Sequence, residues 1–172
     1  MKISIIINPS SGQQNTDHMD YIYKVLSEHH SVFLNYTKKF YDAKSHAIKS
    51  VEEKCDLIIV SGGDGTVNRV VNGLAEMDSK IPLAIYPGGT SNDFASYLGI
   101  RKNPKEFLKI IDDFYCMDVD LGQVNDIYFM NVAAIGEIAG VASNTDKDLK
   151  AKLGRFAYYI DGISKLPDFF DD

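Results

Sequence analysis

The feature that most constrains the fold is an apolar strand that ends in a glycine-rich turn and continues as a helix. Residues 58–60 are Ile-Ile-Val, residues 61–66 are Ser-Gly-Gly-Asp-Gly-Thr, and apolar residues then recur at helical spacing as far as Leu74. Where a strand turns directly into a helix, the first backbone N–H groups of the helix and its dipole can bind phosphate. Glycine lets the backbone approach an anion closely and permits positive φ where it is needed. The segment therefore predicts nucleotide binding.

Strands and helices alternate along the first two thirds of the chain. The patterns predict strands over 3–7, 32–36, 57–60 and 81–86, and helices over 16–29, 43–51, 66–77, 92–98 and 104–111. Strands that alternate with helices through short loops form right-handed βαβ units. We therefore expect an α/β fold, a Rossmann-like parallel sheet with helices on both faces. Ligands of such sheets bind beyond the carboxyl ends of the strands.

The pattern changes after Tyr115 and becomes rich in β-type segments. Strands are expected over 117–121, 127–135 and 138–142, with a turn at 123–126 and a helix over 149–166. Two or three strands and one helix are a poor independent domain. We expect a nucleotide-binding α/β domain over 1–115 and an incomplete β-rich second domain over 116–172.

The composition excludes several classes of protein. The net charge of −6 argues against nucleic-acid binding, and any contact with an anionic membrane has to be local. No stretch is long enough for a transmembrane span or a signal peptide. Cys55 and Cys116 are expected to be buried thiols in a reducing compartment. The expected location is the cytoplasm, with visits to a membrane surface.

Two further turns follow predicted strands, at 8–12 (Asn-Pro-Ser-Ser-Gly) and at 87–95 (Pro-Gly-Gly-Thr-Ser-Asn-Asp-Phe-Ala). The glycine turn at 62–65 is neither a Walker A loop nor a dinucleotide fingerprint. In the simplest interpretation, Asp64 or Thr66 caps one helix and Asn92 or Asp93 caps another. In the functional interpretation the glycines admit phosphate and Asp64 holds Mg²⁺ or its waters. The four histidines lack metal-ligand spacing and are expected at the surface.

Together the three turns resemble the diacylglycerol kinase catalytic-domain family, which includes bacterial diacylglycerol kinases and sphingosine and ceramide kinases. The segments that carry the resemblance are 8–12, 62–68 with 72–74, and 87–95, and segments 117–122, 129–131 and 154–158 match later landmarks. NAD kinases and phosphofructokinases have turns similar to the second segment. The Asn-Asp-Phe-Ala ending of the third favours the lipid kinases.

The resemblance implies an ATP-dependent kinase that phosphorylates the hydroxyl of diacylglycerol or a related lipid. By position, Asp64, Asp93 and Asp120 would form an aspartate–water–Mg²⁺ network. The lipid hydroxyl would attack the γ-phosphate in line, and a carboxylate would take its proton. The residues implied for ATP are Asn8, Pro9, Ser10, Ser11, Gly12, Thr37, Gly63, Asp64, Gly65, Thr66, Val67, Asn68, Arg69 and Thr90.

The resemblance also implies that this chain matches only part of a family member. Members of the family continue, complete a β-sandwich of which 116–172 would be the start, and carry the catalytic base in that continuation. No residue here is assigned as the base, and we expect the chain alone to bind ATP with little or no turnover.

Three other interpretations stay open from the sequence. They are a kinase of a soluble substrate such as NAD, a non-enzymatic nucleotide-binding module, and a plain α/β domain with glycine turns. The expected partners are ATP and a lipid alcohol at the inner membrane surface, and an open sheet edge leaves a homodimer open.

Overall fold

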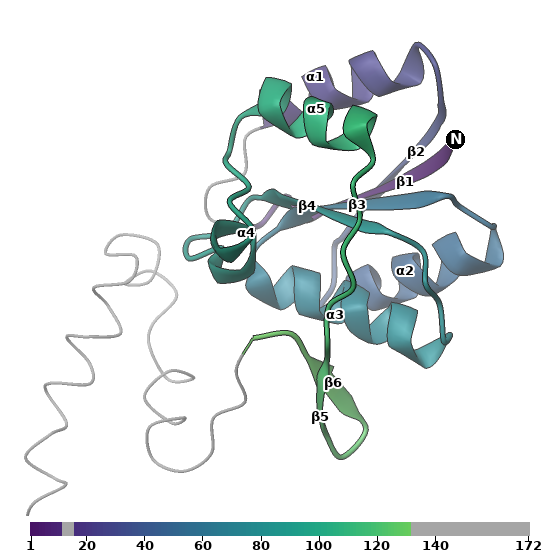
Figure 1. Cartoon of the computed structure of the whole chain (residues 1–172). Coiled ribbons are helices and arrows are strands. Elements are labelled where there is room, and N and C mark those ends of the chain that lie inside the picture. The colour runs from purple at the N-terminus through teal and green to yellow at the C-terminus, as the bar shows by residue number, and fades with distance from the viewer. Residues whose placement is uncertain (12–15, 132–172) are drawn as a thin grey trace, which may run out of the picture. The chain divides into compact units, whose positions relative to one another are not determined.

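The computed structural model describes residues 1–11 and 16–131, which belong to one compact unit, Met1–Asn131. At its centre is a four-stranded parallel sheet with the strand order β2-β1-β3-β4 (Figure 1). The elements are β1 (Lys2–Ile7), α1 (Thr16–Ser27), β2 (Ser31–Tyr36), α2 (Asp42–Glu52), β3 (Leu57–Gly62), α3 (Asp64–Glu76), β4 (Leu83–Pro87), α4 (Asp93–Tyr97), α5 (Pro104–Asp113), β5 (Gly122–Val124) and β6 (Ile127–Phe129). The predicted α/β fold is confirmed.

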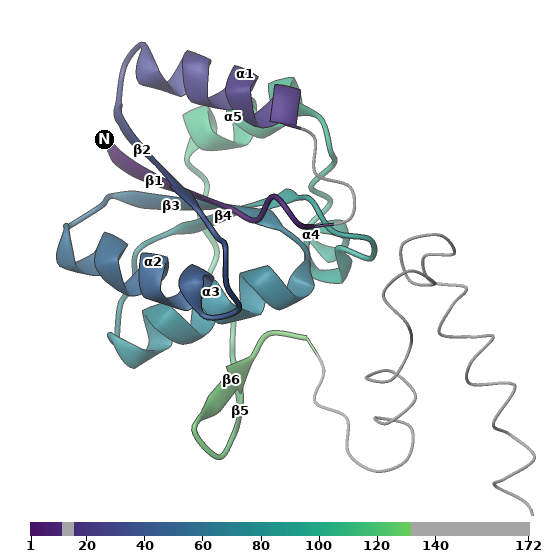
Figure 2. The same ribbon diagram turned by 180° about the vertical axis from the view of Figure 1, so that it is seen from behind.

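Helices cover both faces of the sheet, as Figures 1 and 2 show from opposite sides. Successive side chains of a strand point to opposite faces, so a strand buried on both sides is apolar throughout. Ile3, Ile5 and Ile59 pack with α1 and α5, whereas Ile6 and Ile58 pack with α2 and α3. This double burial explains why β1 and β3 consist mostly of isoleucine, leucine and valine.

Gly73, in the last turn of α3, lies where α3 contacts α2. A Cβ atom at Gly73 would lie 2.7 Å from the carbonyl oxygen of Lys44 and 2.9 Å from the Cβ of Ala47. An ion pair between Lys44 and Glu76 joins the same two helices. A glycine within a helix costs about 0.5–1 kcal/mol relative to alanine, and here it allows the close contact between α2 and α3.

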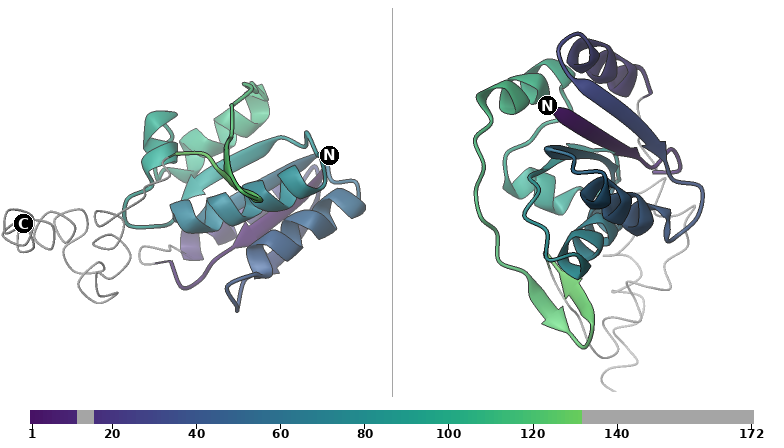
Figure 3. Two further views of the ribbon diagram at one scale, coloured as in Figure 1. Left: turned by 90° about the horizontal axis from the view of Figure 1, so that it is seen from below. Right: turned by 90° about the vertical axis from the view of Figure 1, so that its right-hand side faces the viewer.

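The chain leaves the sheet after α5 and ends its described part in a short hairpin. β5 and β6 pair antiparallel through a turn at Asn125, whose φ of 52° is left-handed. The strand predicted over 117–121 is wrong: residues 115–121 are extended, exposed and without a paired strand in the described part of the chain. They run from the α1/α5 layer to the α2/α3 layer on the β4 side (Figures 1 and 3).

An alternation of apolar and polar residues makes a strand only where a neighbouring strand can pair with it, which explains this error. Cys116 lies in the same segment and is exposed, so its predicted burial is wrong, whereas Cys55 is buried as expected.

The predicted segments beyond 131 lie outside the described residues. The domain boundary predicted at 115 stays a prediction, although the compact unit continues to Asn131. No helix in the described ranges has the length and apolarity needed to cross a bilayer.

Candidate nucleotide site

The candidate site lies at the carboxyl ends of the parallel strands. From β1, the chain continues to β2 on one side of the sheet and later to β3 and β4 on the other. Such a reversal opens a crevice between the two central strands, here β1 and β3, where ligands of open α/β sheets bind. The turns that follow β1, β3 and β4 all begin at this edge. Topology thus brings together the three segments that the sequence singled out.

The glycine turn, Gly62–Gly65, leads from β3 into α3 without a side-chain cap. Gly63 occupies the N-cap position with φ −86° and ψ 176°, an extended conformation open to any residue. Among the described glycines only Gly99 has a positive φ, so positive φ does not explain the glycines of this turn. Because the N-cap residue is glycine, no N-cap side chain accepts a bond from the first backbone N–H groups of α3.

Close packing explains two of these glycines. A Cβ atom at Gly62 would lie 2.7 Å from the Cβ of Thr66, and one at Gly63 would lie 3.1 Å from the Cα of Gly89. A Cβ at Gly89 would overlap the Cα of Gly63, and the N–H of Gly88 donates to the carbonyl of Gly62 at 3.0 Å. The turns after β3 and β4 therefore pack backbone against backbone.

Gly65 differs from its neighbours because no backbone lies against it. It is exposed, and the nearest atoms to an added Cβ would be the two Nη atoms of Arg69, at 4.0 Å. Of the glycines in this turn, Gly65 leaves the most room for a bound group.

Asn8 connects the end of β1 to the first turn of α3. Its side-chain N–H donates to the hydroxyl of Thr66 at 2.8 Å, and its backbone N–H donates to the carbonyl of Ser61 at 2.9 Å. Its side-chain oxygen accepts from the N–H of Ser10 at 3.1 Å. Thr66 is 3% exposed and accepts this bond across the turn, so it does not cap α3.

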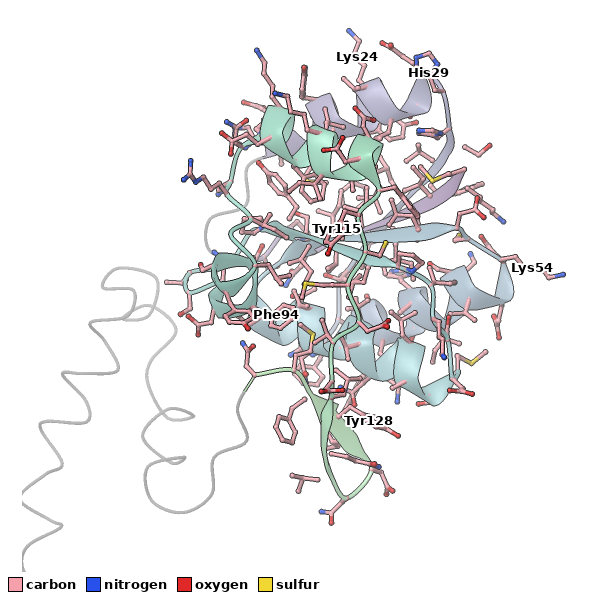
Figure 4. All side chains as sticks on the ribbon, viewed as in Figure 1. Lys24, His29, Lys54, Phe94, Tyr115 and Tyr128 are labelled. Atoms are coloured by element: carbon pink, nitrogen blue, oxygen red, sulfur yellow. The ribbon has the colours of Figure 1, made fainter. Side chains whose placement is uncertain are left out.

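The side chain of Asn92 stabilises the turn after β4, and Asp64 joins this turn to α3. The side chain of Asn92 accepts from the N–H of Gly89 and donates to its carbonyl, both at 2.7 Å. Asp64 accepts a hydrogen bond at 3.3 Å from the N–H of Phe94 in the first turn of α4. Phe94 itself packs against α3 (Figure 4). The carboxylate at the start of α3 therefore caps α4, whereas Asn92 occupies the N-cap position of α4 without a side-chain cap.

The loop after β2 forms another side of the site. Thr37 is 8% exposed and its N–H donates to the carbonyl of Ile7 at 2.9 Å. Asp42 accepts from the N–H groups of Lys38 and Lys39 at 2.7 and 2.8 Å, and these bonds hold the pKa of Asp42 below its ordinary value. Next in this loop, the ring of Phe40 lies 3.7 Å from the guanidinium carbon of Arg69. The loop is thus held against both β1 and α3.

Comparison with known proteins decides the family. The model of the diacylglycerol kinase catalytic domain matches residues 2–124, which includes every described element except β6. The chain belongs to the diacylglycerol kinase catalytic-domain family. The resemblance expected from the three turns is confirmed.

Curated relatives and solved structures agree with this assignment. The chain is 38% identical over 165 residues to a diacylglycerol kinase of Staphylococcus epidermidis, covering 95% of this chain and 52% of that protein. A diacylglycerol kinase of Staphylococcus aureus matches with the same identity and coverage. A crystal structure of a diacylglycerol kinase from Bacillus anthracis strain Sterne matches with a TM-score of 0.73 and 35% identity, covering 94% of this chain and 54% of that one. The chain thus spans about half the length of the curated relatives that it matches.

Most of the residues predicted for ATP share this edge of the family fold. Asn8, the segment Gly63–Thr66 and the loop that contains Thr90 are joined by the bonds described above. Pro9 and Ser10 are exposed on the turn after β1, and Gly12 lies outside the described residues. Their roles stay predictions.

The predicted metal residues are only partly connected. Asp64 bonds to the backbone of Phe94, the residue after Asp93, whereas Asp120 lies in the exposed segment before β5. Over residues 1–11 and 16–131, no group of three His, Cys, Asp or Glu side chains could hold a metal directly. The predicted water-mediated network stays a prediction.

Sequence reasoning missed two side-chain contacts between distant residues. Phe40 is one of several aromatic residues in the segment 33–41 and has no distinct signal among them. Its contact with Arg69 depends on how a loop and a helix meet. His18, expected at the surface, forms a hydrogen bond of 2.6 Å with the hydroxyl of buried Tyr86 on β4. Neither pair leaves a pattern in the sequence, since its members are far apart along the chain.

Proposed function

We propose that this chain provides the ATP site of a lipid kinase that transfers the γ-phosphate of ATP to the hydroxyl of diacylglycerol or a related lipid. The products would be ADP and phosphatidic acid or another lipid phosphate. The observation that carries the proposal is the joining of three distant turns at one edge of the sheet, through Asn8 and Thr66, Gly63 and Gly89, and Asp64 and Phe94. Membership of the diacylglycerol kinase family supports the choice of reaction.

The phosphates of ATP would lie at the start of α3. The uncapped first turn offers backbone N–H groups and the positive end of the helix dipole. Gly65 has room for a bound group. The turn that contains Thr90 packs against Gly63, and the loop that contains Thr37 contacts α3 through Phe40 and Arg69. The other residues of this proposed site are those of the turn after β1 and the segment Gly63–Arg69.

The acidic residues fit a magnesium ion by their chemistry. Mg²⁺ prefers oxygen ligands and usually keeps several waters, so carboxylates need not chelate it as a cluster. Asp64, Asp93 and Asp120 are the residues that we propose to hold it through water. When bound, the ion would neutralise charge on the β- and γ-phosphates.

The protein's own contribution is then mainly positioning. The glycine turn would hold the phosphate chain in one orientation, and the acceptor hydroxyl would approach the γ-phosphate in line. No described residue is assigned as the general base. The lipid would be reached at the inner membrane surface from the cytoplasm, and a homodimer stays a prediction.

The test has one part for binding and one for transfer. Calorimetric titration of the chain with ATP, with and without Mg²⁺, measures binding without requiring turnover. Transfer of label from γ-labelled ATP is then measured with diacylglycerol micelles, sphingosine micelles, or NAD without detergent. This part uses a chain extended to the length of the curated relatives, because the present chain spans about half of that length and is expected to turn over little.

The outcomes separate the candidate functions. Labelled lipid supports the proposal and names the lipid. Labelled NAD would replace it with a kinase of a soluble substrate. ATP binding without transfer to any acceptor would favour a nucleotide-binding module, and no ATP binding would refute the nucleotide site itself.

A further inference from the structure

Arg69 is a partly buried cation without an anionic partner in the described part of the chain. Its Nε is buried and has no hydrogen-bond partner there, and the ion pairs found in this part join other residues. The chain has 24 Asp and Glu residues, so acidic side chains are plentiful. Burial lowers the pKa of Arg69, and no carboxylate among residues 1–11 and 16–131 offsets this shift. Removing a charge from water without a partner costs free energy that a bound anion would recover.

Phe40 covers one face of this guanidinium. The ring centroid lies 3.7 Å from the guanidinium carbon, within the range of a cation–π contact. Stacking of this kind fixes the plane of the group and leaves the N–H donors at its edge available for a planar contact. Phe40 is 62% exposed, so it contributes little to the core.

The free edge of Arg69 lies beside the glycine turn. Both Nη atoms are 4.0 Å from the position of a Cβ on Gly65, four residues earlier on α3. Side chains of a helix point back toward its N-terminus, which brings position i+4 against position i. The donors of Arg69 are thus at the uncapped start of α3. There the charge of Arg69 and the positive end of the helix dipole both favour a bound anion.

We propose that Phe40 and Arg69 form a phosphate-binding pair, in which Phe40 positions the guanidinium and Arg69 donates to a phosphate group at the glycine turn. Phosphate oxygens match the guanidinium fork and can accept from both of its ends. The assignment of that phosphate to ATP rests on the proposed function. Phe40 is a positioning residue, since it acts only through Arg69.

The experiment is a set of calorimetric titrations of the full chain with inorganic tripolyphosphate, AMP and ATP, each with Mg²⁺. The variants are Arg69→Met, Phe40→Leu, both together, and Phe40→Tyr. Phe33→Leu is the matched control, because the ring of Phe33, on β2, also has a cation–π contact, in which the Nζ of Lys2 lies 5.2 Å from the ring centroid. Thermal melting checks that each variant is folded.

We expect Arg69→Met to weaken ATP and tripolyphosphate binding by about tenfold or more. Phe40→Leu should weaken both by about threefold. Phe40→Tyr should keep most of the wild-type affinity, because it keeps the ring face. The double variant should bind no worse than Arg69→Met, since Phe40 has no effect once the guanidinium is absent. AMP should be affected less than ATP, and Phe33→Leu should match the wild type.

Unchanged ATP and tripolyphosphate affinity in Phe40→Leu, or losses that add fully in the double variant, would overturn the pair. If the wild type binds tripolyphosphate but not ATP, and Arg69→Met weakens it, the phosphate pair stands and the nucleotide site fails. If neither ligand binds, both proposals fail.

Discussion

Asn72 of α3 and Tyr128 of β6 are joined by two hydrogen bonds. The side-chain N–H of Asn72 donates to the carbonyl of Tyr128 at 2.8 Å, and its side-chain oxygen accepts from the N–H of Tyr128 at 2.9 Å. One amide side chain therefore makes both bonds that a neighbouring strand would make with this residue. The hairpin of β5 and β6 is attached in this way to the helix whose start forms the candidate phosphate site.

Replacing Asn72 with leucine should detach the hairpin without unfolding the sheet. Losing both bonds leaves the N–H of Tyr128 exposed to solvent, so its hydrogen exchange should accelerate by about tenfold or more. Exchange at Tyr128, read by NMR or mass spectrometry, measures this change. Gln123→Ala is the control, because it removes a bond inside the hairpin, to the carbonyl of Asn125, and none to α3. Unchanged protection of Tyr128 in the leucine variant would show that other contacts hold the hairpin.

Asp64→Asn should separate the structural role of this residue from its proposed metal role. The asparagine oxygen can still accept from the N–H of Phe94, so the free energy of unfolding should change by less than about 1 kcal/mol. The lost charge should remove the Mg²⁺ dependence of ATP binding. Asp64→Ala should lose the same dependence and also destabilise the fold by about 0.5–2 kcal/mol through the lost cap of α4. Titrations with and without Mg²⁺ and denaturant melts give both quantities. Mg²⁺-dependent binding of ATP by the asparagine variant at wild-type strength would refute the metal role.

Gly65→Ala and Gly89→Ala should have opposite effects on stability. At Gly65 a Cβ meets only the Nη atoms of Arg69 at 4.0 Å, so alanine should stabilise α3 by up to about 1 kcal/mol while it obstructs the phosphate. At Gly89 a Cβ would overlap the backbone of Gly63, so alanine should destabilise the fold by about 2 kcal/mol or more. Thermal melting and ATP titration measure the two effects. A Gly65→Ala protein that is more stable and binds ATP normally would exclude phosphate from this turn.

The sequence predicts the elements of this fold well because each depends on local chemistry. The apolar run of β3, the helical spacing in α3 and the proline at the start of α5 all point to the observed structure. Asn103 caps α5 with bonds to the N–H groups of Lys105 and Glu106, as its position before Pro104 permits. Such signals need no knowledge of distant neighbours.

The errors and omissions concern contacts between distant segments. Asp64 was considered as a cap for its own helix but caps α4, because the turn after β4 packs against Gly63. Close packing with Thr66 and Gly89 explains Gly62 and Gly63, and neither has a positive φ. These facts depend on which turns become neighbours in the sheet, which residue spacing alone does not determine.

Tyr86 should make the protein less stable at alkaline pH. Burial raises the pKa of Tyr86 from 10.0 to about 12, because the phenolate would lose its hydration, and the residue is 1% exposed. Above pH 10 the unfolded chain loses this proton before the folded protein does. The contribution of Tyr86 to the free energy of unfolding is therefore complete below about pH 10. As the pH rises to about 12, the free energy of unfolding falls by about 2–3 kcal/mol. Denaturant melts across this range, with Tyr86→Phe for comparison, isolate this contribution, and Tyr115→Phe controls for an exposed tyrosine. An identical alkaline profile for the wild type and Tyr86→Phe would contradict the prediction.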